Sequence, residues 1–320
     1  MLKKIAVMTS GGDSPGMNAA IRALVRVAMH EGVETWGIYD GYSGMVEDRM
    51  VKLDSRAVGD IIQRGGTILG TARCEEFRTP EGRAKGLENM RRRGIEGLVV
   101  IGGDGSLTGA TLLVKEGFPV VGLPGTIDND IWGTDYTIGF DTTVNTVVDA
   151  INKLRDTASA HGRVIVIEAM GRHSGWIAMT AGLAGGAEQI LVPEMAVSIE
   201  DTIAKLKQSR ASGKKYSIIV VAEGVGNTAE LGKRIEEETG LETRVSILGH
   251  IQRGGSPSVF DRILASTLAE RAVMALLSGI SGVMFGSRNG AVVSIDMEDA
   301  ISHKKTLDTS LFRLANLLAQ

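Results

Sequence analysis

Short apolar runs rich in β-branched residues alternate with longer amphipathic segments along most of the 320-residue chain. Such runs are typical of strands that are buried on both faces, and the longer segments between them are typical of helices. The pattern therefore predicts an α/β protein with mainly parallel sheets. The runs that we interpret as strands are Lys4–Thr9, Gly97–Ile101, Pro119–Leu123, Arg163–Ile167 and Tyr216–Ala222.

Nearly every predicted strand ends in a polar or glycine-rich loop. Ligands of open α/β sheets bind at the carboxyl ends of the strands, so these loops are the candidates for an active site. The loops are Ser10–Asp13, Gly102–Ser106, Pro124–Asp130, Glu168–Arg172 and Glu223–Gly224, and the predicted helices include Met17–His30, Thr142–Ala160 and Phe260–Leu277.

The length of the chain favours two domains, because a single hydrophobic core seldom serves 320 residues. No repeat of fixed period and no Pro/Ser-rich linker marks a boundary between them. A helix-like stretch follows the last loop of the first strand set and precedes a new strand at Arg163. We therefore expect the chain to leave the first domain near Phe140.

Charge and cysteine content narrow the function classes. Lys and Arg number 35 against 38 Asp and Glu, without a long run of like charge, so we expect neither a nucleic-acid partner nor a membrane partner. Cys74 is the only cysteine, which precludes an intramolecular disulfide and fits a reducing cytoplasm. The first nine residues are too short an apolar run for a signal peptide or a membrane span. These features predict a cytoplasmic protein.

The loop Ser10–Asn18 joins a predicted strand to a predicted helix and is rich in small residues. Small residues let the backbone approach a phosphate closely, and the start of a helix adds N–H groups and the positive end of its dipole. A tight turn between strand and helix is the simpler interpretation. This loop alone does not decide between the two.

The loop Gly102–Ser106 is a sharper signal. Its backbone amides could hold phosphate oxygens while Asp104 faces the Mg²⁺ that accompanies them. The sequence has no Walker A pattern, and Thr108 stands where the dinucleotide-binding fingerprint needs its third glycine. A nucleotide bound in neither of those ways is therefore predicted.

Two carboxylates follow the next strand. Asp128 and Asp130 are two positions apart and share one face if the segment is extended. One could accept a hydroxyl proton while the other orients a neighbour or a metal, whereas a turn that stabilises its own backbone is the more common role of Asp-Asn-Asp. Beside Gly102–Ser106, however, Thr126–Asp130 resembles the base loop of a kinase.

The segment Gly249–Pro257 places His250 and Arg253 in a glycine-rich turn, with Arg244 upstream. Arginine binds phosphate with two parallel hydrogen bonds, and a histidine can add a donor, so a phosphorylated substrate is indicated. A solvated surface loop remains the alternative. The five histidines show no HExxH spacing, so no zinc site is predicted.

Taken together, these motifs and Met170-Gly171-Arg172 resemble the bacterial ATP-dependent 6-phosphofructokinase family, from about Lys4 to beyond Asp299. The resemblance implies two Rossmann-like three-layer α/β/α domains with the active site in the cleft between them. It further implies a larger ATP-binding domain of residues 1–138 and 251–301 and a smaller fructose 6-phosphate-binding domain of residues 139–250 and 302–320.

The resemblance also implies the reaction, in which the γ-phosphoryl group of MgATP passes to the 1-hydroxyl of fructose 6-phosphate. Asp128 is the implied base, Arg73 and Arg172 the cations at the transferring group, and Gly12 and Thr126 further catalytic positions. Arg163 and Arg244 are implied to reach the 6-phosphate from a neighbouring subunit. The implied ATP-binding residues are Gly12, Arg73, Cys74, Gly103, Asp104, Gly105 and Ser106, with Asp104 at Mg²⁺, and the implied substrate-binding residues are Thr126, Asp128, Asp130, Arg163, Met170, Gly171, Arg172, Glu223, Arg244, His250 and Arg253.

Regulation is implied as well. The family binds ADP or phosphoenolpyruvate between the subunits of a homotetramer, and the matching positions here are Arg22, Arg26, Arg155, Glu188, Lys214 and Lys215. Ser55 and Ser212 depart from members that carry basic residues there, with Arg56 and Arg210 nearby. The alternative is that Arg22 and Arg26, four residues apart, simply lie on a solvated face of a helix, which is the more usual place for such a pair.

Three alternatives compete with this interpretation. Gly-Gly-Asp-Gly also occurs in NAD kinases and diacylglycerol kinases, but these would not require the loops at 126–130 and 250–257. A pyrophosphate-dependent phosphofructokinase typically carries Asp and Lys at the places of Gly105 and Gly125. A non-catalytic regulatory subunit would be signalled by loss of Asp104, Asp128 or Arg172, and all three are present.

Overall fold

The computed structural model describes residues 2–196 and 198–318, and the chain divides into two compact units. Unit 1 comprises residues 1–127, 131–142 and 253–305, and unit 2 comprises residues 128–130, 143–252 and 306–320. The sequence interpretation placed the changes of domain after residues 138, 250 and 301. Which domain binds which ligand stays a prediction.

Unit 1 is built on a seven-stranded sheet in the order β11-β10-β5-β4-β1-β2-β3. Strands β5, β4, β1 and β2 pair in parallel, β10 continues this direction beside β5, and the outermost strands β11 and β3 are antiparallel to their neighbours. The strands are β1 Lys4–Ser10, β2 Glu34–Ile38, β3 Met50–Leu53, β4 Gly97–Gly102, β5 Val120–Pro124, β10 Val283–Arg288 and β11 Ala291–Asp296.

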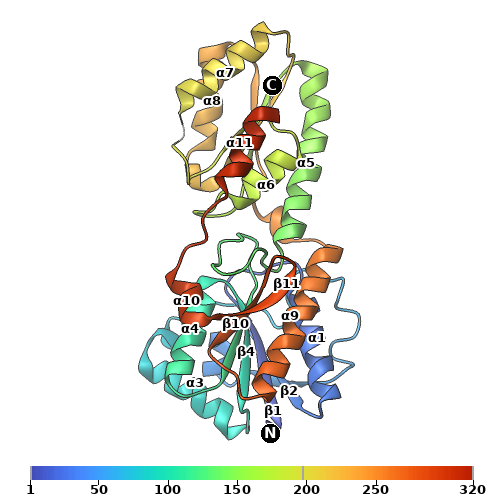
Figure 1. The fold of residues 1–320 in the computed structure, drawn as a ribbon, viewed down its shortest axis with the longest axis vertical. Coiled ribbons are helices and arrows are strands. Elements are labelled where there is room, and N and C mark those ends of the chain that lie inside the picture. The colour runs from blue at the N-terminus through green and yellow to red at the C-terminus, as the bar shows by residue number, and fades with distance from the viewer. Residues whose placement is uncertain (1, 197, 319–320) are drawn as a thin grey trace. The chain divides into compact units, whose positions relative to one another are not determined.

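Helices cover both faces of this sheet, which gives three layers (Figure 1). Alternate residues of β1 face opposite ways: Ile5 and Val7 join one buried apolar cluster with residues of α1 and α9, whereas Ala6 and Met8 join another with residues of α3 and α4. The helices of unit 1 are α1 Met17–His30, α2 Tyr42–Val46, α3 Pro80–Arg92, α4 Asp104–Lys115, α9 Val259–Leu277 and α10 Met297–Ser302, with a 3₁₀ turn at Glu76–Arg78.

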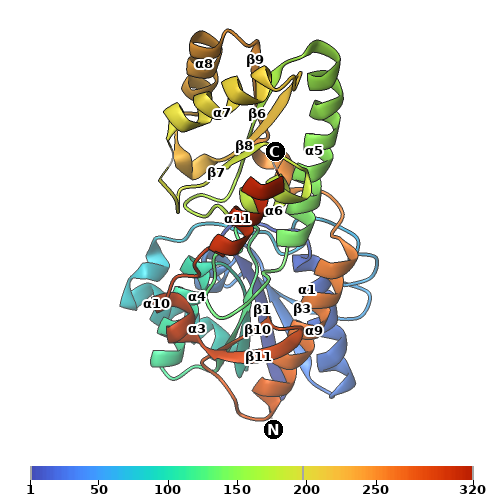
Figure 2. The ribbon, with the colours of Figure 1, turned by 45° about the horizontal axis from the view of Figure 1, so that its top comes forward.

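Unit 2 contains a four-stranded parallel sheet in the order β7-β8-β6-β9. Helices α7 and α8 pack on one face, and Figure 2 shows α5 (Phe140–His161) and α6 on the other side of the strands. The strands are β6 Val164–Ala169, β7 Gln189–Leu191, β8 Ser217–Ala222 and β9 Thr243–Ile247, and the helices are α6 Trp176–Ala184, α7 Ile199–Ala211, α8 Thr228–Thr239 and α11 Thr309–Leu318, with 3₁₀ turns at Glu223–Val225 and Gly249–Arg253.

Polar side chains mark where several helices begin. Thr79 caps α3, whose first residue is Pro80, and Ser198, Asn227 and Ser258 accept backbone N–H bonds at the starts of α7, α8 and α9. Each cap satisfies an amide that has no partner inside its helix. Within the described residues, no helix is both long enough and apolar enough to cross a lipid bilayer.

The α/β architecture confirms the predicted fold class. The five predicted strands are all present as β1, β4, β5, β6 and β8, and the three predicted helices are α1, α5 and α9. Helix α5, Phe140–His161, begins in unit 1 and continues into unit 2. It therefore carries the chain from one unit to the other.

Candidate active site

The loop after β1 lies beside Arg253 in unit 1. The Nη1 atom of Arg253 donates to the carbonyl oxygen of Asp13 at 3.1 Å, although 240 residues separate the two in sequence. A Cβ atom added to Gly12 would collide with this guanidinium. Glycine at position 12 thus leaves room for an arginine that we predicted at the 6-phosphate.

The loop after β4 opens helix α4, as predicted. Asp104 and Gly105 are exposed in its first turn, and a Cβ atom added to Gly105 would meet nothing within 4 Å. Ser106 is buried, and its carbonyl oxygen accepts a hydrogen bond from the Tyr42 hydroxyl at 2.6 Å. The turn therefore presents a carboxylate and open space to solvent while its far side is fixed in the core.

Arg73 and Cys74 precede a segment that Tyr42 and Arg83 hold in place. Arg73 is exposed, and Cys74 packs against the core cluster that contains Phe77. The Phe77 ring stacks on Tyr42 with centroids 3.9 Å apart, and buried Arg83 donates to the Arg78 carbonyl oxygen at 2.9 Å. Tyr42 thus contacts the predicted ATP-binding residue Ser106 and also Phe77, three residues after Cys74, a role that sequence reasoning missed.

The segment after β5 is tightly packed at its start. A Cβ atom added to Gly125 would lie 2.8 Å from Cγ2 of Ile101 and 3.2 Å from the backbone nitrogen of Gly102. Thr137 donates from Oγ1 to the carbonyl oxygen of Thr126 at 2.6 Å. A side chain at position 125 would therefore displace the strand that leads into the Gly102–Ser106 loop.

Asp128 and Asp130 belong to unit 2, although the residues on either side of this short stretch belong to unit 1. Asn129 between them adopts a positive φ of 51°, so the segment is not extended and the condition for a shared face of the two carboxylates is not met. Asp128 is buried and Asp130 is partly exposed.

Asp128 lies near Arg172, one of the two cations that we predicted at the transferring group. Its Oδ2 atom is 3.9 Å from Nε of Arg172, and its carbonyl oxygen accepts from the Ser174 hydroxyl at 3.0 Å. The carboxylate is almost fully shielded, with 7% of the side chain exposed, whereas 64% of the Arg172 side chain is exposed. A buried carboxylate beside a solvent-facing guanidinium is an arrangement suited to an anionic substrate.

Glu223 fixes the backbone of the Met170–Arg172 loop. Its Oε1 atom accepts from the backbone N–H groups of Gly171, at 3.2 Å, and Arg172, at 2.6 Å. The fully buried Gln252 accepts from the Met170 N–H at 3.1 Å through its own side chain. Sequence reasoning named Glu223 as a substrate ligand and missed Gln252, whose contacts here hold the loop from the other side.

Arg163 and Arg244 lie far along their strands from these loops. Arg163 precedes β6, and Arg244 is the second residue of β9, whereas Met170 and His250 follow the carboxyl ends of the same two strands. A strand rises about 3.3 Å per residue, so the six residues of β6 separate Arg163 from Met170 by about 20 Å. Within one chain, the structure does not bring these arginines to Asp128 and Arg172.

Four of the six predicted effector residues lie in unit 2, where three of them are linked. Lys214 pairs with Glu188 at 3.1 Å, and Arg155 lies 4.0 Å from the same carboxylate oxygen. Arg22 and Arg26 lie in unit 1, on α1.

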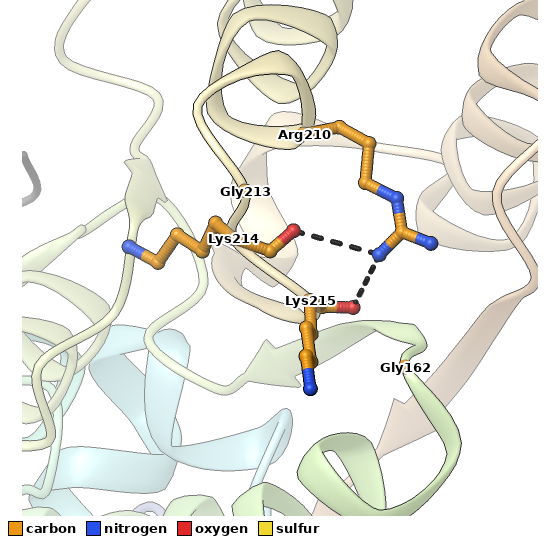
Figure 3. Close-up of a pocket in the computed structure, with 5 residues that line it drawn as sticks. All are labelled: Gly162, Arg210, Gly213, Lys214 and Lys215. Carbon is orange, nitrogen blue, oxygen red and sulfur yellow. Dashed lines mark hydrogen bonds between the residues drawn. The ribbon is translucent and has the colours of Figure 1, made fainter.

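A cavity of about 290 Å³ adjoins this group and is lined by Gly162, Arg210, Gly213, Lys214 and Lys215. Figure 3 shows Arg210 turned toward the carbonyl oxygens of Lys214 and Lys215, to which it donates at 3.5 and 2.9 Å, while both ammonium groups point away from it. The lining residues include three cations and no acid, so the cavity is suited to an anion.

A buried carboxylate that sequence reasoning missed lies where α5 begins. Asp261 is fully buried in unit 1 and accepts from the N–H groups of Gly139 and Thr142, both at 2.8 Å, and from the Thr142 hydroxyl. Burial raises the pKa of Asp261 to about 6, and the hydrogen bonds from Thr142 and Gly139 oppose this rise. Asp261 therefore caps the helix that leaves unit 1.

The family model described as phosphofructokinase matches residues 4–276, which is most of the chain. The chain belongs to the phosphofructokinase family. A relative from Bacillus pumilus named ATP-dependent 6-phosphofructokinase is 60% identical over 318 residues, which cover 99% of this chain and all of the relative.

Solved phosphofructokinases share the fold. The structure of phosphofructokinase from Saccharomyces cerevisiae has a TM-score of 0.89 and 37% identity; the match covers 99% of this chain and 48% of the yeast chain, so this chain spans about half of that one. A pyrophosphate-dependent phosphofructokinase from Marinobacter aquaeolei has a TM-score of 0.87 at 20% identity, over 99% of this chain and 91% of that one. The latter likeness shows the phosphofructokinase fold alone.

Proposed function

We propose that this chain is an ATP-dependent 6-phosphofructokinase, which transfers the γ-phosphoryl group of MgATP to the 1-hydroxyl of D-fructose 6-phosphate and yields fructose 1,6-bisphosphate and ADP. The observation that carries this proposal is the full-length, 60% identity to the Bacillus pumilus enzyme of that name. The placement of Asp128 beside Arg172 supports it, because the pair offers a base and a cation together.

In the proposed reaction the oxygen of the 1-hydroxyl attacks the γ-phosphorus, and Asp128 accepts the proton of that hydroxyl. Arg172 and Arg73 offset the negative charge of the transferring group, and Asp104 would hold the Mg²⁺ that accompanies ATP, which would help to neutralise the phosphates. Glu223 accepts a hydrogen bond from the backbone N–H of Arg172, so the Arg172 side chain extends from a fixed backbone position. Burial of Asp128 limits competition from water for the same proton.

ATP is the donor that the small residues favour over pyrophosphate. Open space around Gly105 accommodates the α-phosphate and nucleoside, which pyrophosphate lacks. A lysine at position 125, as in the pyrophosphate-dependent branch, would require Ile101 and the backbone at Gly102 to move. The tight packing around position 125 therefore fits a glycine, the residue that this chain carries, and not a lysine.

The active assembly that we propose is a homotetramer whose subunits share sites. Arg163, about 20 Å along β6 from the loop of its own chain, and Arg244, at the start of the neighbouring strand β9, would bind the 6-phosphate held by a neighbour. His250 and Arg253 would hold the same phosphate from its own chain. ADP or phosphoenolpyruvate would bind at Arg22 and Arg26 of one chain and at the Arg155, Glu188, Lys214 and Lys215 group of another.

The test is product formation from fructose 6-phosphate with MgATP or with Mg-pyrophosphate as the sole donor, each with and without ADP and phosphoenolpyruvate. Turnover with ATP alone, altered by an effector, is the expected result. Turnover with pyrophosphate would overturn the donor assignment, and no turnover with either would favour a regulatory subunit.

We expect the protein to act in the cytoplasm.

A further inference from the structure

Glu242 binds both arginines that the proposed function assigns to the substrate of a neighbouring subunit. Its Oε1 atom is 2.8 Å from Nη2 of Arg163 and 2.6 Å from Nη2 of Arg244. One oxygen atom thus holds two guanidinium groups close together. A carboxylate oxygen between two guanidinium groups makes the same kind of charge-assisted hydrogen bonds that a phosphate oxygen would make.

The backbone brings these three side chains close together. Val164 N–H donates to the Glu242 carbonyl oxygen at 3.0 Å, so residues 163 and 242 stand side by side where β6 and β9 begin. Arg244 follows two positions after Glu242, which places both side chains on one face of the sheet. The register of these two strands therefore gathers the three side chains.

The charges around Glu242 keep it ionised. The hydrogen bond from Arg163 holds the pKa of Glu242 below its usual value, and the charges of Arg163, Arg244 and His161 act in the same direction. Glu236 is the next carboxylate, 3.9 Å from Nη1 of Arg244, and it accepts from the Thr243 N–H at 3.4 Å. Glu242 is thus the only one of the two that pairs closely with both arginines.

Arg163 is not fully satisfied in this arrangement. Its Nε atom is buried and has no hydrogen-bond acceptor among residues 2–196 and 198–318. A buried donor without an acceptor is unfavourable, so a ligand that offers more acceptors than one carboxylate oxygen would stabilise a different placement of this side chain. A phosphate group, with three acceptor oxygens, is such a ligand.

We propose that Glu242 is a positioning residue that holds Arg163 and Arg244 as an internal substitute for the 6-phosphate of fructose 6-phosphate and must yield them when that substrate binds. This inference rests on the proposed function, because it takes the phosphate-binding role of the two arginines from it. A carboxylate left beside the dianionic phosphate would also repel it. Glu242 therefore lowers the affinity for the sugar phosphate and has no role toward ATP.

The test is Glu242→Gln, which keeps the size of the side chain and removes its charge. We expect the half-saturation concentration for fructose 6-phosphate to fall about five-fold, equivalent to about 1 kcal/mol, while that for MgATP stays as in the parent protein. Calorimetric titration with fructose 6-phosphate alone should show the same gain. Glu242→Asp keeps the charge, so its half-saturation concentration for fructose 6-phosphate should stay close to that of the parent protein.

Glu236→Gln is the matched control, since it removes the neighbouring charge without breaking a close pair with Arg163; it should shift the half-saturation by less than about two-fold. Arg163→Ala and Arg244→Ala should each raise the half-saturation, and in the double arginine variant Glu242→Gln should have no further effect.

These measurements distinguish a failure of the inference about Glu242 from a failure of the proposed function. If the arginine variants raise the half-saturation but Glu242→Gln leaves it unchanged or raises it, the inference about Glu242 is wrong and the proposed function stands. If Glu242→Gln still lowers the half-saturation without the arginines, it acts through another group and the inference fails. If neither arginine variant has an effect, their proposed role is wrong and the inference falls with it.

Discussion

The buried carboxylate of Asp261 should make the stability of unit 1 depend on pH. Its pKa is about 6 in the folded chain, compared with 3.8 for an ordinary aspartate. Because the folded state binds this proton more tightly than the unfolded state, the group stabilises the fold fully below its unfolded pKa. That stability is lost as the pH rises through the folded pKa. The shift corresponds in full to about 3 kcal/mol.

The perturbation is Asp261→Asn, which removes the titration and keeps the shape. From about pH 4.5 to about pH 7.5, the free energy of unfolding of the parent should fall by about 2 kcal/mol relative to that of the variant, since part of the full effect lies below this range. Urea unfolding followed by tryptophan fluorescence is the assay, because Trp36 and Trp132 both belong to unit 1.

The absolute stability of Asp261→Asn is a separate matter, since its amide would face the N–H donors of Gly139 or Thr142 and lose hydrogen bonds. The difference between the two pH values isolates the titration from that loss. Thr142→Val is a matched control, because it removes one donor to the carboxylate and leaves the carboxyl group to titrate. A constant difference between parent and Asp261→Asn across this pH range would refute the assignment of the raised pKa.

Three further predictions concern the site. Asp128→Ser should slow turnover by about 10²–10⁴-fold with calorimetric binding of fructose 6-phosphate nearly intact, and unchanged turnover would remove its role as base. Arg26→Ala should reduce the shift in kinetics caused by ADP or phosphoenolpyruvate, and an intact response would place the effector elsewhere. Gly125→Ala should lower the free energy of unfolding by about 1–3 kcal/mol, whereas Gly105→Ala, with open space around it, should cost little; equal effects on urea unfolding would contradict the packing argument.

The strands that the sequence predicts correctly are those buried on both faces. β4 and β8, for example, are buried at every position, so their apolar runs are continuous. β9 was missed because Thr243–Ile247 has one buried residue and no such run. The hairpin of β10 and β11 did carry a signal, since Asn289-Gly290 joins two β-rich segments and both residues have positive φ.

The candidate residues of the site can be identified from the sequence more readily than the contacts that support them. Gly102–Ser106 is recognised from its own residue types, but the bond from Tyr42 to Ser106 spans 64 positions and that from Thr142 to Asp261 spans 119. Nothing local in the sequence marks Tyr42, Gln252 or Asp261 as partners of these loops. Such partners are set by how the sheet orders its strands, which periodicity does not determine.

The separation of Arg163 and Arg244 from the Asp128 loop along the strands has a genetic consequence if each chain serves its neighbour. A chain lacking Arg172 would still contribute Arg163 and Arg244 to its neighbour's site. A chain lacking Arg244 would still have an intact Asp128 loop and Arg172 in its own site. Two inactive alleles of these kinds, expressed together, would form mixed assemblies in which some sites receive both intact halves. The two alleles would then complement each other, and the activity recovered would depend on the ratio in which the two chains are made.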